Sequence, residues 1–284
     1  MRVIDSHVHF WDPGVLHYPW HAELPAMQRR FLPADLGSLA DGSVAGVVFV
    51  EANCLPEEAA SEIAFVEHLA RNEARLLGAV ASVDFTSAET RLRSLALLDG
   101  GELVVGARQN IQGNPAGFAL QDEYVRGVQD VGARNLGFDL CISADQMPEA
   151  IALVASCPET RFILDHCGKP AIRNDAFAPW ADDLARLANF GNVHCKLSGL
   201  LTEARPDQCH AAGIAPYARH AMSCFGPDRL IYGSDWPVVT AAGIEPQWRA
   251  LAETFTSSWT RAERQAFFHD NAVRFYGLRL NAQS

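Results

Sequence analysis

No segment of the sequence is suited to cross a membrane. The longest apolar runs, such as residues 44–50, fall far short of the roughly 20 residues that a membrane-spanning helix needs. The first residues contain no apolar stretch like that of a secretory signal peptide. We therefore expect a cytoplasmic protein that has no membrane partner.

Cysteine is present but lacks the spacing of a disulfide framework or of a zinc ribbon. The seven cysteines are odd in number, and no two of them form a C-x-x-C pair. Disulfide scaffolds are also typical of secreted chains much shorter than this one of 284 residues. We expect the thiols to be reduced and mostly buried.

The sequence lacks the motifs of two common classes of nucleotide-binding fold. No G-x-G-x-x-G and no G-x-x-x-x-G-K-[ST] segment follows a strand-like run. Charged residues make up only 20% of the chain, and the net charge of −11 would repel nucleic acid. The chain is 49% hydrophobic, which is enough for a large buried core. This composition suits a soluble enzyme of small molecules without a nucleic-acid partner.

Short apolar runs rich in β-branched residues recur along the whole chain. Eight of them begin near Val3, Val44, Leu76, Leu103, Asn135, Arg161, Asn192 and Arg229, with 26 to 41 residues between successive starts. Each interval is about the length of one strand and one crossover helix, and several runs are apolar throughout, as in parallel strands covered on both faces. Because a TIM barrel takes roughly 250 residues, we predict an α/β fold, a TIM (β/α)₈ barrel that residues 1–284 form as a single domain.

Helical periodicity lies between these runs. It covers residues 33–40, 56–72, 146–155, 181–188, 219–225 and 258–276. Thr260 and Glu263 have the spacing of a capping box at the start of the last helix. Residues 10–32 form an unusually long connection after the first strand, and it contains Trp11, Tyr18 and Trp20. We expect an ordered flap over the barrel mouth, either purely structural or in contact with the substrate.

Ionisable residues lie where the predicted strands end. They are His7 and His9 at the first strand, Glu51 at the second, Arg108 at the fourth, Asp165 and His166 at the sixth, Lys196 in the seventh and Asp235 at the eighth. The C-terminal ends of the strands form the active site of a TIM barrel. His7 and His9 are two residues apart on a strand, so both side chains point to the same face. The first and last strands are neighbours in a closed barrel, which brings Asp235 within reach of both histidines.

Two imidazoles and a carboxylate are a ligand set typical of zinc or manganese hydrolases. We therefore interpret His7, His9 and Asp235 as metal ligands, with Glu51 as a further candidate. The alternatives are ordinary hydrogen bonds for the histidines and a turn or helix-capping role for Asp235. For Glu51 the alternative is an ion pair with Arg108.

The remaining candidates concern catalysis and substrate binding. The predicted catalytic residues are Asp235 and His166, and the predicted substrate-binding residues are Arg108, Lys196, Trp20 and Trp236. A histidine in a turn can instead be purely structural. The arginine and the lysine are costly to bury at a barrel mouth without partners, so they either hold substrate oxygens or neutralise nearby carboxylates. The tryptophans could stack on a sugar ring, although tryptophan more often packs in a core.

Five blocks of sequence together resemble a known superfamily. They are residues 4–12 (IDSHVHFWD), 18–20 (YPW), 165–170 (DHCGKP), 233–237 (GSDWP) and 271–278 (NAVRFYGL). They resemble the amidohydrolase superfamily and, within it, the branch of TIM-barrel lactonases that includes L-fuconolactonase, L-rhamnonolactonase and pyrone-dicarboxylate lactonase. The blocks extend over nearly the whole chain and are specific for the branch, but much less so for the substrate.

The resemblance implies roles for four residues. His7 and His9 match the metal pair of the first strand, His166 matches the histidine of the sixth strand, and Asp235 matches the aspartate of the eighth. The chain departs from the superfamily's two-metal pattern, because residues 135–142 contain no histidine and the fourth strand offers no lysine that could be carbamylated. We expect one divalent metal, zinc in the first place, or a site that works without metal, as some lactonases of this branch do.

The residues and the resemblance together predict hydrolysis of a sugar-acid lactone, such as L-fuconolactone, to the aldonic acid. Asp235 would activate water, and a single metal, or His166 with Arg108, would polarise the carbonyl group. The alternatives are another lactone or carboxylic-ester hydrolase and a metal-dependent decarboxylase of the same superfamily. A more remote alternative is a non-catalytic barrel that binds a metal. The sequence leaves the lactone, the metal and the oligomeric state open.

Overall fold

Eight parallel strands form one sheet that closes on itself. The computed structural model describes residues 2–280, and its strands are hydrogen-bonded in chain order. They are β1 (Ile4–Val8), β2 (Gly46–Val50), β3 (Leu76–Ser82), β4 (Val104–Arg108), β5 (Gly137–Leu140), β6 (Arg161–Leu164), β7 (Val193–Leu197) and β8 (Leu230–Tyr232). A parallel bridge between Val8 and Trp236 joins the chain after β8 to β1. The predicted (β/α)₈ barrel is confirmed, and each strand begins within two residues of its expected start.

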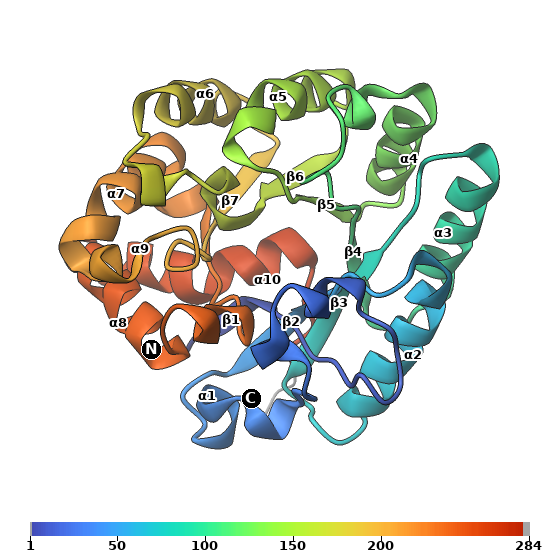
Figure 1. The fold of residues 1–284 in the computed structure, drawn as a ribbon, viewed down its shortest axis with the longest axis horizontal. Coiled ribbons are helices and arrows are strands. Elements are labelled where there is room, and N and C mark those ends of the chain that lie inside the picture. Colours follow the sequence, from blue (N-terminus) through green and yellow to red (C-terminus); the bar gives the residue numbers. More distant parts are fainter. Residues whose placement is uncertain (1, 281–284) are drawn as a thin grey trace.

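Helices surround the strands on the outer side of the barrel, except the last of them, which lies across one end of it (Figure 1). They are α1 (Gly37–Ala40), α2 (Ala59–Ala70), α3 (Ala88–Gly100), α4 (Asp122–Ala133), α5 (Met147–Ser156), α6 (Ala178–Ala188), α7 (Ala211–Arg229), α8 (Glu245–Phe255), α9 (Arg261–Gln265) and α10 (Asn271–Tyr276). Within residues 2–280, no helix is both long and apolar enough to span a bilayer.

Several helices differ from their predicted extents. Residues 33–40 form a 3-10 turn and the short α1, and α6 begins three residues before its predicted start. The helix expected at residues 219–225 is only the middle of α7. The helix expected at residues 258–276 is divided, because a π-helical turn at Ala266–Asp270 separates α9 from α10. The capping box of α9 is confirmed. The Glu263 amide donates a hydrogen bond to the Thr260 hydroxyl oxygen at 3.2 Å, and the Thr260 amide donates to the Glu263 carboxylate at 2.7 Å.

The barrel interior is filled by branched side chains and is covered at one end by aromatic rings. The buried interior cluster contains Ile4, Val48, Val50, Val80, Ile163 and Ile231. Phe275 and Tyr276 of α10 belong to the same cluster. Since successive residues of a strand point to opposite faces, the alternate positions Val47 and Phe49 pack outward in the larger core beneath the helices. The apolar character of β2 on both faces follows from this double burial.

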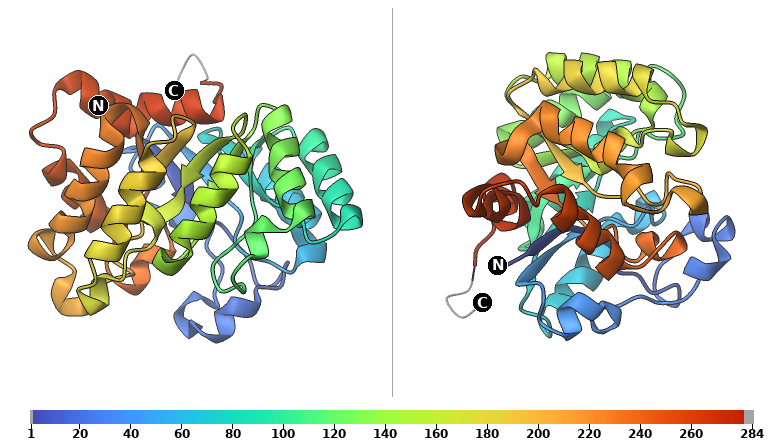
Figure 2. Two further views of the ribbon diagram at one scale, coloured as in Figure 1. Left: turned by 90° about the horizontal axis from the view of Figure 1, so that it is seen from above. Right: turned by 90° about the vertical axis from the view of Figure 1, so that its left-hand side faces the viewer.

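The two ends of the barrel differ in what covers them. The start of β1 and α10 lie on one side, whereas the long segment after β1 lies on the opposite side (Figure 2). This segment, residues 10–32, contains two short 3-10 turns and a bridge between Trp11 and Phe31. The Trp20 indole N–H donates a hydrogen bond to the Ala52 carbonyl oxygen at 2.7 Å, which ties the segment to the loop after β2. The long connection is therefore an ordered cover beside the C-terminal ends of the strands.

The seven cysteines are free thiols, and five of them are buried. Cys167 and Cys195, for example, have no exposed surface and belong to the hydrophobic core. A buried thiol behaves as a small apolar side chain, so these residues contribute to packing.

One carboxyl group of α2 is buried without a cation at hydrogen-bond distance. Glu62 has no exposed surface, and its Oε1 atom accepts a hydrogen bond from the Ala52 amide at 3.0 Å. Among the described residues, its Oε2 atom has no hydrogen-bond partner. Burial, together with the nearby Glu51 carboxylate, raises the pKa of Glu62 to about 8. The carboxyl group is therefore mainly protonated in the folded protein near neutral pH.

We predict that Glu62 makes the folded protein less stable as the pH rises. An unfolded glutamate loses its proton near pH 4.5, whereas the folded one keeps it until about pH 8. The folded state therefore binds the extra proton between these values, and its stability falls as the pH rises through that window. Glu62→Gln should remove this dependence. The melting temperature of the variant relative to the wild type should increase between about pH 5 and about pH 9.

The control for this prediction is Glu57→Gln, which changes an exposed glutamate just before α2. Its melting temperature relative to the wild type should stay constant over the same range. A constant relative melting temperature for Glu62→Gln as well would show that Glu62 titrates normally in the folded protein.

Candidate active site

The seam between β8 and β1 sets the geometry of the site. The Asp235 amide donates a hydrogen bond to the His7 carbonyl oxygen at 2.9 Å, and the His9 amide donates to the Trp236 carbonyl oxygen at 2.8 Å. Asp235 has a left-handed backbone with φ of 62°, a conformation that is rare outside glycine and gathers at functional sites. These constraints hold the Asp235 side chain against those of His7 and His9.

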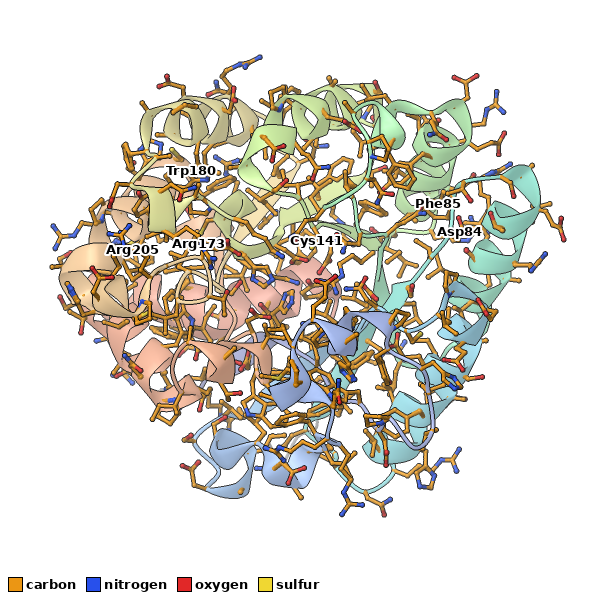
Figure 3. The ribbon with its side chains drawn as sticks, in the orientation of Figure 1. Asp84, Phe85, Cys141, Arg173, Trp180 and Arg205 are labelled. Atoms are coloured by element: carbon orange, nitrogen blue, oxygen red, sulfur yellow. The ribbon has the colours of Figure 1, made fainter. Side chains whose placement is uncertain are left out.

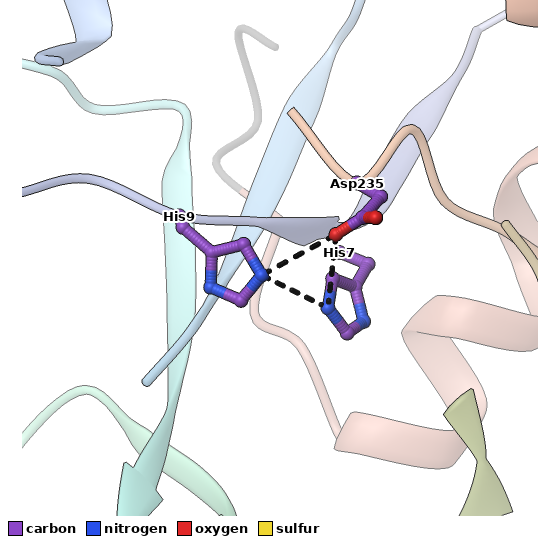
Figure 4. Close-up of side chains that lie close together, drawn as sticks. All are labelled: His7, His9 and Asp235. Carbon is purple, nitrogen blue, oxygen red and sulfur yellow. Dashed lines mark hydrogen bonds and ion pairs between the residues drawn. The ribbon is translucent and has the colours of Figure 1, made fainter. Parts of the chain in front are cut away.

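Three buried ligand atoms meet at this seam. The Nε2 atom of His7 lies 3.2 Å from Nε2 of His9 and 3.8 Å from Oδ1 of Asp235, and Nε2 of His9 lies 3.5 Å from the same oxygen (Figure 4). Zinc–ligand distances near 2.0–2.2 Å place neighbouring tetrahedral ligand atoms about 3.3 Å apart. The structure thus brings the three predicted ligands together at separations that fit one ion.

The outer nitrogens of both histidines also suit metal binding. Nδ1 of His9 lies 2.8 Å from the Val50 carbonyl oxygen, which can only accept, so in a neutral ring the proton is on Nδ1 and Nε2 keeps its lone pair. Nδ1 of His7 lies 3.3 Å from Asp165 Oδ1, so a neutral ring that carries its proton on Nδ1 keeps the lone pair of Nε2 free, and the Lys196 ammonium group lies 3.0 Å from Nδ1. Burial, together with the Lys196 charge, lowers the pKa of His7 well below its ordinary value. Its ring is therefore neutral, which is the form that binds a metal.

His166 faces the same carboxylate from the end of β6. Its Nε2 atom lies 3.8 Å from Oδ1 of Asp235, and its Nδ1 atom lies 2.9 Å from the Ser198 hydroxyl oxygen. Burial lowers the pKa of His166 to about 4, so the ring is neutral near pH 7. Burial alone would raise the pKa of Asp235, but His166 and His9 outweigh it and the pKa is lowered. An ionised carboxylate thus lies among three imidazoles.

Glu51 is held by Arg108 instead of lying among the ligand atoms. Arg108 Nε donates a hydrogen bond to Glu51 Oε1 at 2.5 Å, and Arg108 Nη1 donates to Asp165 Oδ2 at 3.1 Å. The other carboxylate oxygen of Glu51 accepts from the Asn53 amide at 2.7 Å. Among residues 2–280, Glu51 belongs to neither group of three ligand atoms close enough to share an ion. Of the two alternatives for Glu51, a metal ligand or an ion pair with Arg108, this geometry favours the ion pair.

Two of the predicted substrate-binding residues lie outside the hollow at the barrel mouth. Lys196 has no exposed surface and lies in the barrel interior, where its ammonium group contacts the carboxylates of Asp139 and Asp165. Trp236 is 5% exposed and packs against Phe10 with ring centroids 5.8 Å apart. Charge neutralisation and core packing, which are the structural alternatives, therefore describe these two residues.

A hollow of about 410 Å³ lies at the C-terminal end of the barrel. The predicted residues that line it are His9, Trp20, Arg108, His166 and Asp235. The other polar residues that line it are Glu23, Asn53, Asn110, Gln112, Lys169, Thr202 and Glu203. Cys141, which also lines the hollow, lies near the middle of the barrel mouth in Figure 3. Sequence reasoning misses Thr202 and Glu203, because they lie in the loop beyond β7, where neither a strand end nor a motif marks them.

Comparison with known proteins identifies the family of the chain. The pattern of a family described as amidohydrolase matches residues 4–278. The chain therefore belongs to the amidohydrolase family. It is 34% identical to an L-fucono-1,5-lactonase of Burkholderia multivorans, over 97% of this chain and 96% of that protein. It is 31% identical to an L-fucono-1,5-lactonase of Burkholderia ambifaria, over 97% and 95% of the two chains.

A solved structure shares both the fold and the sequence family. The crystal structure of an amidohydrolase from Burkholderia multivorans with bound zinc matches this structure with a TM-score of 0.88 and 31% sequence identity. The match covers 98% of this chain and 100% of the other.

Gly199 is predicted to be essential for the position of His166. Its φ of 63° is left-handed, and a Cβ atom there would lie 2.5 Å from the His166 ring. We expect Gly199→Ala to displace that ring and to lower kcat in a hydrolysis assay by at least about 10-fold, since a displacement near 1 Å can reduce a rate by about 10²-fold. Gly191→Ala, where a Cβ atom meets no neighbour, is the matched control. Full activity of Gly199→Ala would show that catalysis does not depend on the position of the His166 ring.

Proposed function

We propose that this protein is a lactonase that hydrolyses the lactone of a sugar acid to the free acid. The observation that carries the proposal is the ionised Asp235 carboxylate, which lies among three imidazoles and lines a hollow whose walls combine amide, hydroxyl and charged side chains. The L-fucono-1,5-lactonases to which the chain is similar support the same reaction.

Asp235 is the base in this proposal. Its carboxylate takes a proton from a water molecule in the hollow, and the resulting hydroxide attacks the lactone carbonyl carbon. The bond between that carbon and the ring oxygen then breaks. Asp235 returns its proton to the departing ring oxygen, so the side chain ends the cycle ionised, as it began. General acid–base catalysis of this kind contributes about 10²- to 10⁴-fold.

The negative charge that develops on the carbonyl oxygen needs hydrogen-bond donors. When the Ser198 hydroxyl donates to Nδ1 of the neutral His166 ring, Nε2 carries the ring proton and can donate it to that oxygen. Arg108 makes three hydrogen bonds to Glu51 and Asp165, which leaves two of its five N–H groups for the substrate. One preorganised donor of this kind is worth about 10²- to 10³-fold in kcat.

We propose His7, His9 and Asp235 as the ligands of one divalent ion, zinc in the first place. The buried nitrogen and oxygen donors and their separations support this assignment, and a related amidohydrolase contains zinc. When bound, such an ion supplies polarisation of the lactone carbonyl group and a lower pKa for bound water.

The charges around the hollow favour an uncharged, hydroxyl-rich ring. Lys169 donates a hydrogen bond to Gln112, and Arg108 is paired with buried carboxylates. Glu23 and Glu203 add negative charge to the lining. A lactone with two carboxylate groups would meet this negative charge, whereas sugar hydroxyls can donate to the carboxylates and bind the amides. We therefore propose a neutral aldonolactone as the substrate.

A panel of lactones tests the proposed substrate class. We expect the enzyme to open neutral aldonolactones, which a pH indicator detects because each ring opening releases a proton near neutral pH. The value of kcat/KM for a pyrone dicarboxylate should be at least about 10-fold lower, because like charges in one site are unfavourable. No activity on any aldonolactone of the panel would reject the proposed function. A preference for the dicarboxylate would reject only the substrate class.

A substitution at Asp235 tests the proposed mechanism. Asp235→Asn keeps the shape of the side chain but removes the base, so kcat should fall at least about 100-fold. Asp84→Asn is the matched control, because Asp84 follows β3 at the same end of the barrel and lies outside the hollow (Figure 3). Its activity should stay near that of the wild type. Near-full activity of Asp235→Asn would show that another group activates the water.

A further inference from the structure

A second set of potential metal ligands lies beside the first. Among residues 2–280, only one other group of three ligand atoms lies within 4.8 Å of one another, and it comes from His7, Asp165 and His166. All three residues are buried. The set shares His7 with the first one, so a second ion would bind Nδ1 of the ring whose Nε2 faces the first.

The ammonium group of Lys196 already lies against this second set. Its Nζ atom is 3.0 Å from Nδ1 of His7 and 3.0 Å from Oδ1 of Asp165, and it also donates a hydrogen bond to Asp139. The distance to Asp165 is that of an ammonium group to a hydrogen-bond acceptor, and the ammonium group is packed directly against Nδ1 of His7. A zinc ion needs its ligand atoms at about 2.0–2.3 Å, so it could reach the same atoms only by displacing the ammonium group.

The groups around Lys196 require a positive charge at this position. Asp139 and Asp165 have no exposed surface. Asp139 accepts further hydrogen bonds from the Tyr276 hydroxyl, and Asp165 accepts one from Arg108. Arg108 is itself shared with Glu51, so it does not neutralise Asp165 alone. Removing one partner of a buried ion pair leaves an uncompensated charge, and another cation or a proton must then replace it.

We propose that Lys196 is the resident cation of the barrel interior, which takes the place of a second metal ion and limits the site to one. In this role Lys196 is a positioning residue, since it contacts His7 and Asp165 but does not line the hollow. The inference rests on the metal-binding role proposed for His7, His9 and Asp235. The absence of a histidine in β5 is one reason to expect a single metal ion. Lys196 is a second reason, because it fills the position of a second ion.

The zinc content of two Lys196 variants tests this inference. Lys196→Ala removes the charge and opens the volume, whereas Lys196→Met removes the charge but fills most of the volume. Each protein is stripped with a chelator, dialysed against zinc chloride, desalted and analysed by plasma mass spectrometry. We expect Lys196→Ala to hold one ion per chain more than the wild type, and Lys196→Met to hold the same number as the wild type. Added zinc should raise the melting temperature of Lys196→Ala more than that of Lys196→Met.

The control uses Lys169, the only other lysine of the chain, which lines the hollow. Lys169→Ala should leave the zinc content unchanged. Equal zinc contents in folded Lys196→Ala and the wild type would overturn the inference, and so would an extra ion in Lys196→Met. Two ions in the wild type would overturn it even if neither variant folds.

The same experiment separates this inference from the proposed metal site. A wild-type protein that binds no zinc would contradict the metal role of His7, His9 and Asp235. One additional ion in Lys196→Ala would then still support the role of Lys196 as a resident cation.

Discussion

The hydrogen bonds that join the end of β8 to the end of β1 are the constraint on which the site depends. They bring residues from opposite ends of the chain into contact and place the Asp235 carboxylate against His7 and His9. This contact exists because eight parallel strands in chain order leave the first and last strands as neighbours. In an open sheet the two histidines would lack the carboxylate that we propose as the third metal ligand, and Asp235 would lack their imidazoles. The site is therefore assembled only when the barrel closes.

The charges within the barrel are paired differently at its interior and at its mouth. In the interior, Lys196 lies between two buried carboxylates. At the strand ends, Arg108 joins Glu51 to Asp165. Within residues 2–280, the ion-pair contacts of Asp235 are with imidazoles alone. The carboxylates of Glu51, Asp139 and Asp165 are thus held by arginine or lysine, whereas Asp235 lines the hollow and is available as a base.

The sequence predicts the barrel well because strand runs and their spacing are local patterns, and the strand ends indicate which polar residues converge. It predicts α7 too short, since Pro216 within the helix interrupts the pattern. Spacing cannot choose between a metal and Arg108 as the partner of Glu51, nor between substrate and interior for Lys196. These choices depend on the three-dimensional direction of long side chains. Glu203 is missed because loop residues beyond a strand end carry no periodic signal.

The most direct test of the account is a crystal structure of the Asp235→Asn variant with an unhydrolysed aldonolactone. The account predicts that the lactone lies in the hollow, with its carbonyl carbon within about 4 Å of the side chain at position 235. Its carbonyl oxygen should lie about 3 Å from Nε2 of His166. A lactone bound outside the hollow, or one whose carbonyl group faces away from both side chains, would contradict the account.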